Sequence, residues 1–178
     1  MKIAVMGYSG AGKSTLARKL GNIYDCPVLH LDRIQFEPGW KLRDREKAQA
    51  MVWGFLEENE KIGWIIDGNY SCFCQDRRLR EADLIIFLHY TRRICLWQAW
   101  KRYWNYRGKS RESMADGCNE KMDWEFVRWI LRDGRDEAHS YKRIQEKYPH
   151  KTLVVRNRKQ LKDCMTRLVV RSRERAVR

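Results

Sequence analysis

A glycine-rich stretch close to the start of the chain constrains the fold more than any other feature. The segment GYSGAGKST, residues 7–15, follows the apolar run 2–6 and precedes residues 14–24, whose large apolar side chains recur on one face of a helix. Glycines allow successive backbone N–H groups to converge on one anion, and the start of a helix adds the positive end of its dipole. The order strand, glycine loop and helix therefore predicts a loop that binds phosphate.

The side chains of this loop suit a nucleoside triphosphate and its metal ion. Lys13 carries a charge that can reach the outer phosphates, and Ser14 offers a hydroxyl to Mg²⁺. No Asn-Lys-x-Asp guanine signature occurs in the chain, which favours ATP over GTP. The residues expected to contact ATP in this loop are Gly7, Ser9, Gly10, Ala11, Gly12, Lys13, Ser14 and Thr15.

Apolar runs and amphipathic stretches alternate along the rest of the chain. Strands are predicted at residues 2–6, 28–31, 63–67, 83–90 and 152–156, and helices at 14–24, 44–59, 75–81, 91–106, 124–131, 136–147 and 160–173. Strands that are almost continuous in Val, Ile and Leu, with helices between them, indicate a parallel sheet covered on both faces. We therefore predict an α/β fold in which residues 1–178 form one domain. Ligands of such sheets bind beyond the carboxyl ends of the strands.

Two aspartates follow predicted strands beside the glycine loop. Asp67 ends the strand 63–67, where a carboxylate can hold Mg²⁺ together with Ser14. Gly68 comes next, at a position where ATP-hydrolysing motors commonly carry a glutamate that activates water, so transfer to a bound acceptor is favoured over hydrolysis. Asp32 follows the second strand and can accept the proton of a hydroxyl acceptor. Either aspartate could instead only cap a turn or a helix.

The residues near Asp32 leave the acceptor open. A carboxylate favours an alcohol or a nucleoside, whereas arginines would hold a monophosphate. Six arginines are within plausible reach, although any of them could be a solvated surface charge: Arg33, Arg43, Arg45, Arg77, Arg78 and Arg80. The residues expected to contact the acceptor are Asp32, Arg33, Trp40, Asn69, Tyr70 and Arg78.

The net charge of +14 is concentrated in two segments. Residues 90–111 carry seven basic and no acidic residues, and residues 156–178 carry nine basic and two acidic residues, which accounts for the whole excess. A local excess of this kind indicates a place where anions bind. Residues beyond about 164 are interpreted as a basic C-terminal tail.

Residues 107–123 lack leucine, isoleucine and valine and are too long for an ordinary connection. We predict that they form a lid over the phosphates, because lids supply arginines that neutralise charge during transfer. The arginines expected to act are Arg107 and Arg111, with Arg135 (and Arg132) on the helices that follow. A basic loop without a catalytic role is the alternative.

The segment before this lid places Trp97, Trp100 and Trp104 along one face of a helix. A stripe of large rings is most often part of a core. The alternative is that the rings, interleaved with Lys101 and Arg102, stack on nucleic-acid bases. A core stripe would be buried, and a binding stripe would be exposed.

Composition excludes several other classes. The six cysteines include no CxxC pair and no nearby histidine cluster, so neither a zinc site nor a disulfide framework is indicated. The first strand begins at Lys2, which leaves no room for a targeting peptide, and no apolar run approaches the length of a membrane span. We expect a cytoplasmic protein without a membrane partner.

The motifs together resemble those of adenylate-kinase-like P-loop kinases. More closely, the segments GYSGAGKSTLARKLG, PVLHLDRIQFEPGW, WIIDGNYS and ADLIIFLHY, together with residues 101–131, are similar to bacterial proteins described as DNA topology modulation proteins of the FlaR type, over residues 1–160. The resemblance implies a three-layer αβα sandwich with the sheet order 2-3-1-4-5, ATP and Mg²⁺ on the loop, and adenine near residues 156–158, with Arg156 and Asn157 as contacts. Adenylate kinases carry Phe-Pro-Arg where this chain has Asn69, Tyr70 and Ser71, which argues against AMP as acceptor.

Two functions follow from these features. The first is a small-molecule kinase in which Lys13, Asp32 and the lid arginines move the γ-phosphoryl group of ATP to a nucleoside, a nucleotide or another alcohol with Mg²⁺. The second is a DNA-binding topology regulator on a kinase-like scaffold, which would use the basic helix, the lid and the tail.

Overall fold

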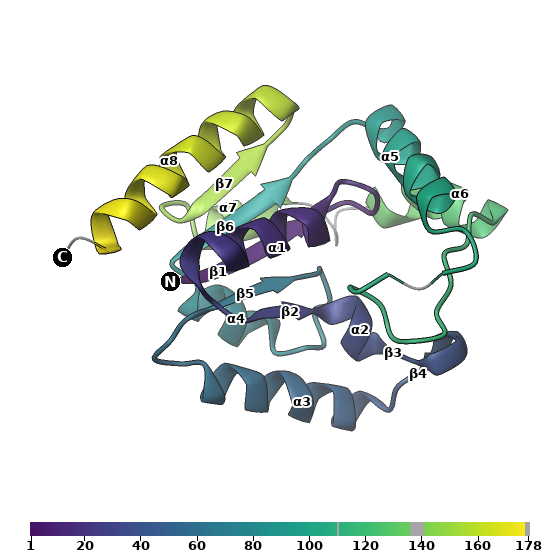
Figure 1. The fold of residues 1–178 in the computed structure, drawn as a ribbon, viewed down its shortest axis with the longest axis horizontal. Helices are drawn as coiled ribbons and strands as arrows, with labels where there is room; N and C mark the ends of the chain where they lie inside the picture. Colours follow the sequence, from purple (N-terminus) through teal and green to yellow (C-terminus); the bar gives the residue numbers. More distant parts are fainter. Residues whose placement is uncertain (110, 136–140, 177–178) are drawn as a thin grey trace.

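A five-stranded parallel sheet forms the centre of the protein in a computed structural model that describes residues 1–109, 111–135 and 141–176 (Figure 1). The strands are β1 (Lys2–Gly7), β2 (Val28–His30), β5 (Trp64–Asp67), β6 (Leu84–Leu88) and β7 (Thr152–Val155), in the spatial order β2-β5-β1-β6-β7. Counted along the chain within this sheet, the order is 2-3-1-4-5, so the predicted α/β fold and strand order are confirmed.

The strands are straightforward to explain from their sequences. The central strands consist almost entirely of β-branched and aliphatic residues, and their side chains are buried on both faces of the sheet. The helices α1 (Lys13–Tyr24) and α8 (Arg158–Ala176) lie side by side on one face, where the Tyr24 hydroxyl donates to the backbone oxygen of Leu168 (Figure 1). On the other face lie α4 (Gln75–Glu81) and α7 (Tyr141–Lys147), joined by an ion pair of 2.7 Å between Lys147 and Asp76.

The remaining elements lie around the carboxyl edge of the sheet and along its β2 side (Figure 1). They are α2 (Leu31–Gln35), the hairpin of β3 (Phe36–Glu37) and β4 (Lys41–Leu42) around a 3₁₀ turn (Pro38–Trp40), α3 (Arg45–Glu58), α5 (Arg92–Asn105), α6 (Trp124–Leu131) and a second 3₁₀ turn (Asp133–Arg135). Three of these helices, α3, α5 and α6, begin at side-chain caps, because Asp44, Thr91 and Asp123 each accept the backbone N–H three residues further on.

The predicted elements differ from the structure at a few boundaries. Asp32 belongs to the first turn of α2 and does not follow a longer strand, since β2 ends at His30. The hairpin at residues 36–42 was not predicted, because each of its strands has only two residues. The predicted helix 160–173 is α8, which continues to Ala176 through most of the segment interpreted as a basic tail and buries Cys164 and Leu168. Part of the predicted helix 136–147 lies outside the described residues, and α7 covers the remainder.

The predicted lid segment 107–123 is packed at its centre. Met114, Ala115 and Cys118 form a small second core against Phe36 and Trp40 of the hairpin. The Trp40 backbone N–H donates to the Cys118 sulfur at 3.3 Å, and the same thiol donates to the backbone oxygen of Glu37. The centre of this segment therefore packs on the β3–β4 hairpin. Among the described residues, no helix is long and apolar enough to cross a membrane.

Candidate active site

The glycine loop connects β1 to α1 and is pressed against the start of α5. Gly10 has φ 78°, and a Cβ atom there would lie 2.3 Å from the backbone oxygen of Cys95. Gly12, at the N-cap of α1, also has a positive φ, and no side chain caps this helix. The N–H groups in the first turn of α1 are therefore left for an external acceptor, as anion binding at a helix start requires.

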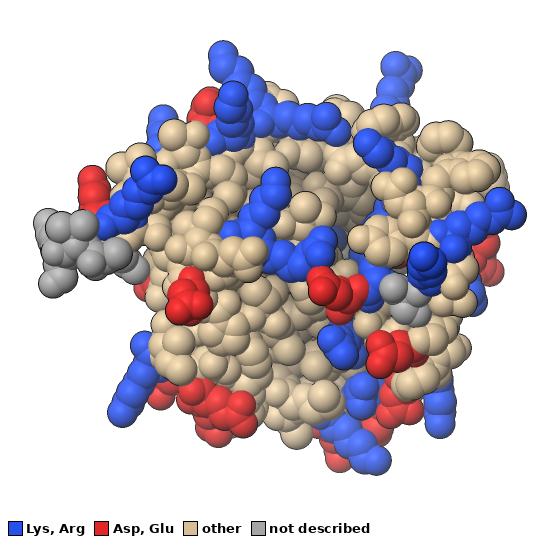
Figure 2. Space-filling model, viewed as in Figure 1, with Lys and Arg blue, Asp and Glu red and all other residues tan. Residues whose placement is uncertain are grey.

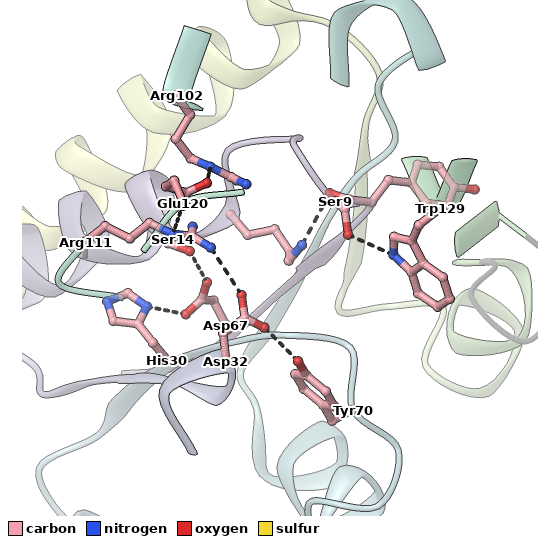
Figure 3. Close-up of polar contacts among 12 residues, drawn as sticks. Ser9, Ser14, His30, Asp32, Asp67, Tyr70, Arg102, Arg111, Glu120 and Trp129 are labelled. Atoms are coloured by element: carbon pink, nitrogen blue, oxygen red, sulfur yellow. Dashed lines mark hydrogen bonds and ion pairs between the residues drawn. The ribbon is translucent and has the colours of Figure 1, made fainter. Parts of the chain in front are cut away.

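Lys13 lies at the centre of the loop. Its ammonium group donates to the backbone oxygen of Tyr8 at 3.2 Å, which holds the side chain across the loop. Burial lowers the pKa of Lys13, while the nearby carboxylates of Asp32 and Asp67 act in the opposite direction. The two predicted aspartates lie close together (Figure 3), and the charges of both act on Lys13.

Asp67 is held at both of its oxygens. Ser14 donates its hydroxyl to Oδ2 at 2.8 Å, and Nδ1 of His30 contacts Oδ1. The second contact follows from the sheet, because the parallel register places His30 of β2 directly opposite Asp67 of β5. A hydroxyl and a carboxylate at the mouth of a phosphate loop are hard oxygen ligands of the kind that Mg²⁺ prefers, so the donor set fits this ion.

Asp32 lies next to this group, on the side away from α1. The Tyr70 hydroxyl donates to its Oδ1 at 2.9 Å, and Nη2 of Arg111 lies 3.8 Å from its Oδ2. Burial and the charge of Asp32 both raise the pKa of Tyr70, so the hydroxyl stays protonated and remains a donor. The carboxylate therefore has a defined orientation beside Lys13.

A cavity of about 400 Å³ opens above α1, between this helix, α5 and the lid segment. Its lining residues are Ser14, Thr15, Arg18, Arg102, Tyr106, Arg111, Glu112 and Ser113. Figure 2 shows lysine and arginine side chains around the hollow on this face. The cavity lies at the start of α1, and three arginines line it, namely Arg18, Arg102 and Arg111. These features make it suitable for a polyanion.

Two of the residues expected to contact the acceptor support the backbone instead. Asn69 exchanges two hydrogen bonds with the backbone of Gly7, at 3.0 and 2.8 Å. Arg78 is wholly buried and donates to the backbone oxygens of Phe73 and Tyr70, and burial lowers its pKa to about 10. These side chains hold the turn that carries Tyr70.

The other predicted site residues are spread around this centre. Ser9 accepts a hydrogen bond from the Trp129 indole, Thr15 lines the cavity, and Arg33 is exposed. Trp40 packs on Phe36, whereas Arg107 lies over the Trp104 ring at 5.7 Å.

Beyond α6, Arg135 lies over the Tyr8 ring at 3.9 Å and donates to the backbone oxygen of Tyr90. Arg156 donates to the Tyr141 hydroxyl, and Asn157 accepts from the backbone N–H of Gln160 at the start of α8. The structure thus brings Lys13, Ser14, Asp67, Asp32, Tyr70 and Arg111 together.

The tryptophan stripe of α5 is exposed, so the expectation that it belongs to the core was wrong. Trp97, Trp100 and Trp104 are 52%, 49% and 53% exposed. The opposite face of α5 is the buried one, and it carries the small residues Cys95 and Ala99 at the glycine loop. Only small side chains allow the helix backbone to approach a phosphate loop so closely, and periodicity of large rings cannot reveal that.

Three polar residues of the site were not predicted. His30 could have been found from the alignment of β2 with β5, but strand register is not visible in one sequence. Arg102 appeared only as a member of the basic helix, and Glu120 appeared only as part of the lid. In the structure Glu120 forms ion pairs with both Arg102 and Arg111 (Figure 3).

Several known proteins similar to this chain are kinases by name. No protein-family model matches the chain. A shikimate kinase of Flavobacterium johnsoniae is 27% identical over 99 residues, which are 49% of this chain and 58% of the relative, so the match spans little more than half of that enzyme. This relative is named for a small-molecule acceptor and not for a role in DNA topology.

Solved structures match over almost the whole chain. A gluconokinase from Sinorhizobium meliloti has a TM-score of 0.51 at 16% identity and covers 98% of this chain and 92% of its own. A deoxyadenosine kinase from M. mycoides, with dCMP and dCDP bound, has a TM-score of 0.53 at 17% identity and covers 94% of this chain and 98% of its own. The protein therefore has the fold of the P-loop kinases.

The two hydrogen bonds between Asn69 and Gly7 lead to a prediction about stability. Replacing Asn69 by Ala removes both hydrogen bonds to Gly7 and leaves two backbone groups beside β1 without these partners. We expect the free energy of unfolding, measured in urea, to fall by about 1–3 kcal/mol. Asn22→Ala, at an exposed position of α1, is the control and should change it by less than about 0.5 kcal/mol. Equal effects of the two substitutions would contradict the bracing role.

Proposed function

We propose that this protein is an ATP-dependent kinase that phosphorylates a hydroxyl group of a small molecule. The observation that carries the proposal is the convergence of Lys13, the Ser14–Asp67 pair and Asp32 at the end of one phosphate-binding loop. The resemblance to kinases by sequence and by fold supports the same reaction class.

The donor nucleotide binds with its phosphates on the loop and in the cavity above α1. The amides at the start of α1 and Lys13 hold the outer phosphates, and Thr15 lies where the chain of phosphates continues. The base lies toward the turn that precedes α8. Arg156 and Asn157 form this turn, and the guanidinium of Arg158 lies over the Trp97 ring at 5.9 Å.

Ser14 and Asp67 are the residues that would hold Mg²⁺. The ion, when bound, neutralises charge that develops on the phosphate oxygens during transfer. His30 contacts one oxygen of Asp67, which fixes the carboxylate so that the other oxygen faces Ser14.

Asp32 is the residue placed to accept a proton. The acceptor oxygen forms a bond to the γ-phosphorus while the bond to the β–γ bridging oxygen breaks, the hydroxyl proton passes to Asp32, and ADP leaves. Tyr70 keeps the carboxylate in position, because its hydroxyl bonds to Oδ1 and leaves Oδ2 toward the site.

The surroundings of Asp32 favour an acceptor without a phosphate group. Three of the arginines that could have held a monophosphate are engaged elsewhere. Arg43 donates to the backbone oxygen of Ile34, Arg77 pairs with Glu81 at 2.8 Å, and Arg78 is buried. An alcohol or a nucleoside is therefore a better acceptor than a nucleoside monophosphate.

A screen for ADP release tests the reaction class. The protein with ATP and Mg²⁺ should release ADP faster when a suitable alcohol is added, and the panel should include gluconate, shikimate, deoxyadenosine and AMP. Lys13→Ala should abolish the stimulated rate because it removes the charge that stabilises the transferring group. A Lys13→Ala variant that turns over at the wild-type rate would overturn the proposal.

The role of Asp32 has its own test. Asp32→Asn keeps the hydrogen bond with Tyr70 possible but removes the proton acceptor, so kcat should fall by about a hundredfold or more with little change in the KM for ATP. A loss of only a few-fold would assign Asp32 to positioning and not to proton transfer.

A nucleic-acid-binding regulator is the second candidate, and the exposure of the α5 stripe is the observation that favours it. Trp100 and Trp104 lie edge to face at 5.8 Å, and Lys101 and Arg107 lie over neighbouring rings of the stripe. Exposed rings between cations are a surface on which single-stranded bases stack. The DNA-topology role that the sequence resemblance implies would use this surface.

Replacing both Trp100 and Trp104 by Ala tests this candidate. Binding of a fluorescent single-stranded oligonucleotide should weaken by about tenfold or more, because each stacked base contributes about 1–3 kcal/mol. Trp124→Ala removes another exposed tryptophan outside the stripe and should leave binding unchanged. Unaltered binding in the double variant would remove the stripe from any nucleic-acid interface.

A further inference from the structure

One buried carboxylate joins two arginines from different parts of the chain. Glu120, whose side chain is 3% exposed, accepts from Nε of Arg102 on α5 at 3.0 Å through Oε2. Its other oxygen, Oε1, forms an ion pair with Nε of Arg111 in the lid segment at 2.5 Å. Each carboxylate oxygen therefore holds one guanidinium, and the two guanidiniums lie side by side (Figure 3).

The geometry of these contacts leaves the phosphate-binding ends of both arginines outside the bridge. The contacts recorded for Glu120 are with the Nε atoms, whereas the terminal nitrogens form the fork that pairs with phosphate oxygens. Both arginines line the cavity above Ser14 and Thr15. A polyphosphate in that cavity would meet the two forks from one side.

Electrostatics also explains why Glu120 contacts both Arg102 and Arg111. Burial lowers the pKa of Arg102, and so does the neighbouring charge of Arg111, while Glu120 acts in the opposite direction. Without the carboxylate, two partly buried cations would repel each other and separate. With it, the cluster keeps one surplus positive charge, which remains available to an anion.

We infer that Glu120 is a positioning residue that holds Arg102 and Arg111 as one clamp for the polyphosphate of the donor nucleotide. The inference rests on the proposed function only in naming a nucleotide as the polyanion. Nη2 of Arg111 lies 3.8 Å from Oδ2 of Asp32, so a bound phosphate chain would compete with this carboxylate for the same guanidinium.

Binding of inorganic tripolyphosphate and of a non-hydrolysable ATP analogue, measured by calorimetry, tests the clamp. Glu120→Gln keeps the shape of the side chain but removes the charge that unites the two arginines. We expect it to weaken the affinity for both ligands by about tenfold or more. The control is Asp116→Asn, which removes one negative charge from an exposed position of the same segment and should leave both affinities unchanged. Equal losses in the two variants, or no loss in Glu120→Gln, would overturn the inference.

A double-mutant cycle separates positioning from general support of the fold. If Glu120 acts through Arg111, the combined Glu120→Gln and Arg111→Lys variant should bind about as weakly as the weaker single variant. A combined loss equal to the product of the two single losses would contradict the coupling. Should Glu120→Gln fail to fold, Arg102→Lys with Glu120 intact decides instead, since the clamp requires a similar loss of affinity from it.

The clamp and the kinase reaction fail in distinguishable ways. Tripolyphosphate binding that depends on Glu120, with no phosphoryl transfer to any acceptor, would retain the clamp and reject the kinase. Transfer at the wild-type rate and the wild-type KM for ATP in Glu120→Gln would retain the kinase and reject the clamp.

Discussion

The parallel register of three strands is the constraint on which the whole site depends. The pairing of β1 with β5 sets Val5 beside Asp67, and the pairing of β2 with β5 sets His30 opposite the same aspartate. The glycine loop, the histidine and the carboxylate therefore end at one level of the sheet. A slip of one residue in β5 would turn Asp67 to the other face and away from Ser14, so the continuous apolar packing of these strands indirectly holds the geometry of the site.

The site also depends on backbone segments that approach each other closely. Gly7 and Asn69 tie the loop to the turn after β5, and Gly10 allows the loop to touch the backbone of α5. The same approach requires small residues, Cys95 and Ala99, on the inner face of α5 and so turns its tryptophans outward. The exposed stripe is thus partly a consequence of how tightly the phosphate loop is held.

Charged residues near the glycine loop differ from those further away from it. The buried cluster near the loop contains both signs, with Lys13 between two aspartates and Glu120 between two arginines. The surplus of basic residues lies further out, on α5, on α8 and around the cavity. In the proposed reaction the inner charges orient the reacting groups, and the outer charges attract the polyanion.

The strand order was implied only by the resemblance to P-loop kinases, whereas the amino-acid sequence by itself determined the strand, glycine loop and helix, the alternation of strands and helices, and the two aspartates at the edge of the sheet. These features follow from local rules, namely the conformational freedom of glycine, apolar runs and the common edge of parallel strands. Only the tertiary structure decided that Asn69 and Arg78 brace the backbone, that the tryptophans of α5 are exposed, and that His30 and Glu120 complete the site. Most of these outcomes depend on contacts between residues far apart in the chain, such as Asn69 with Gly7. A sequence pattern does not show which partner a buried polar group will contact.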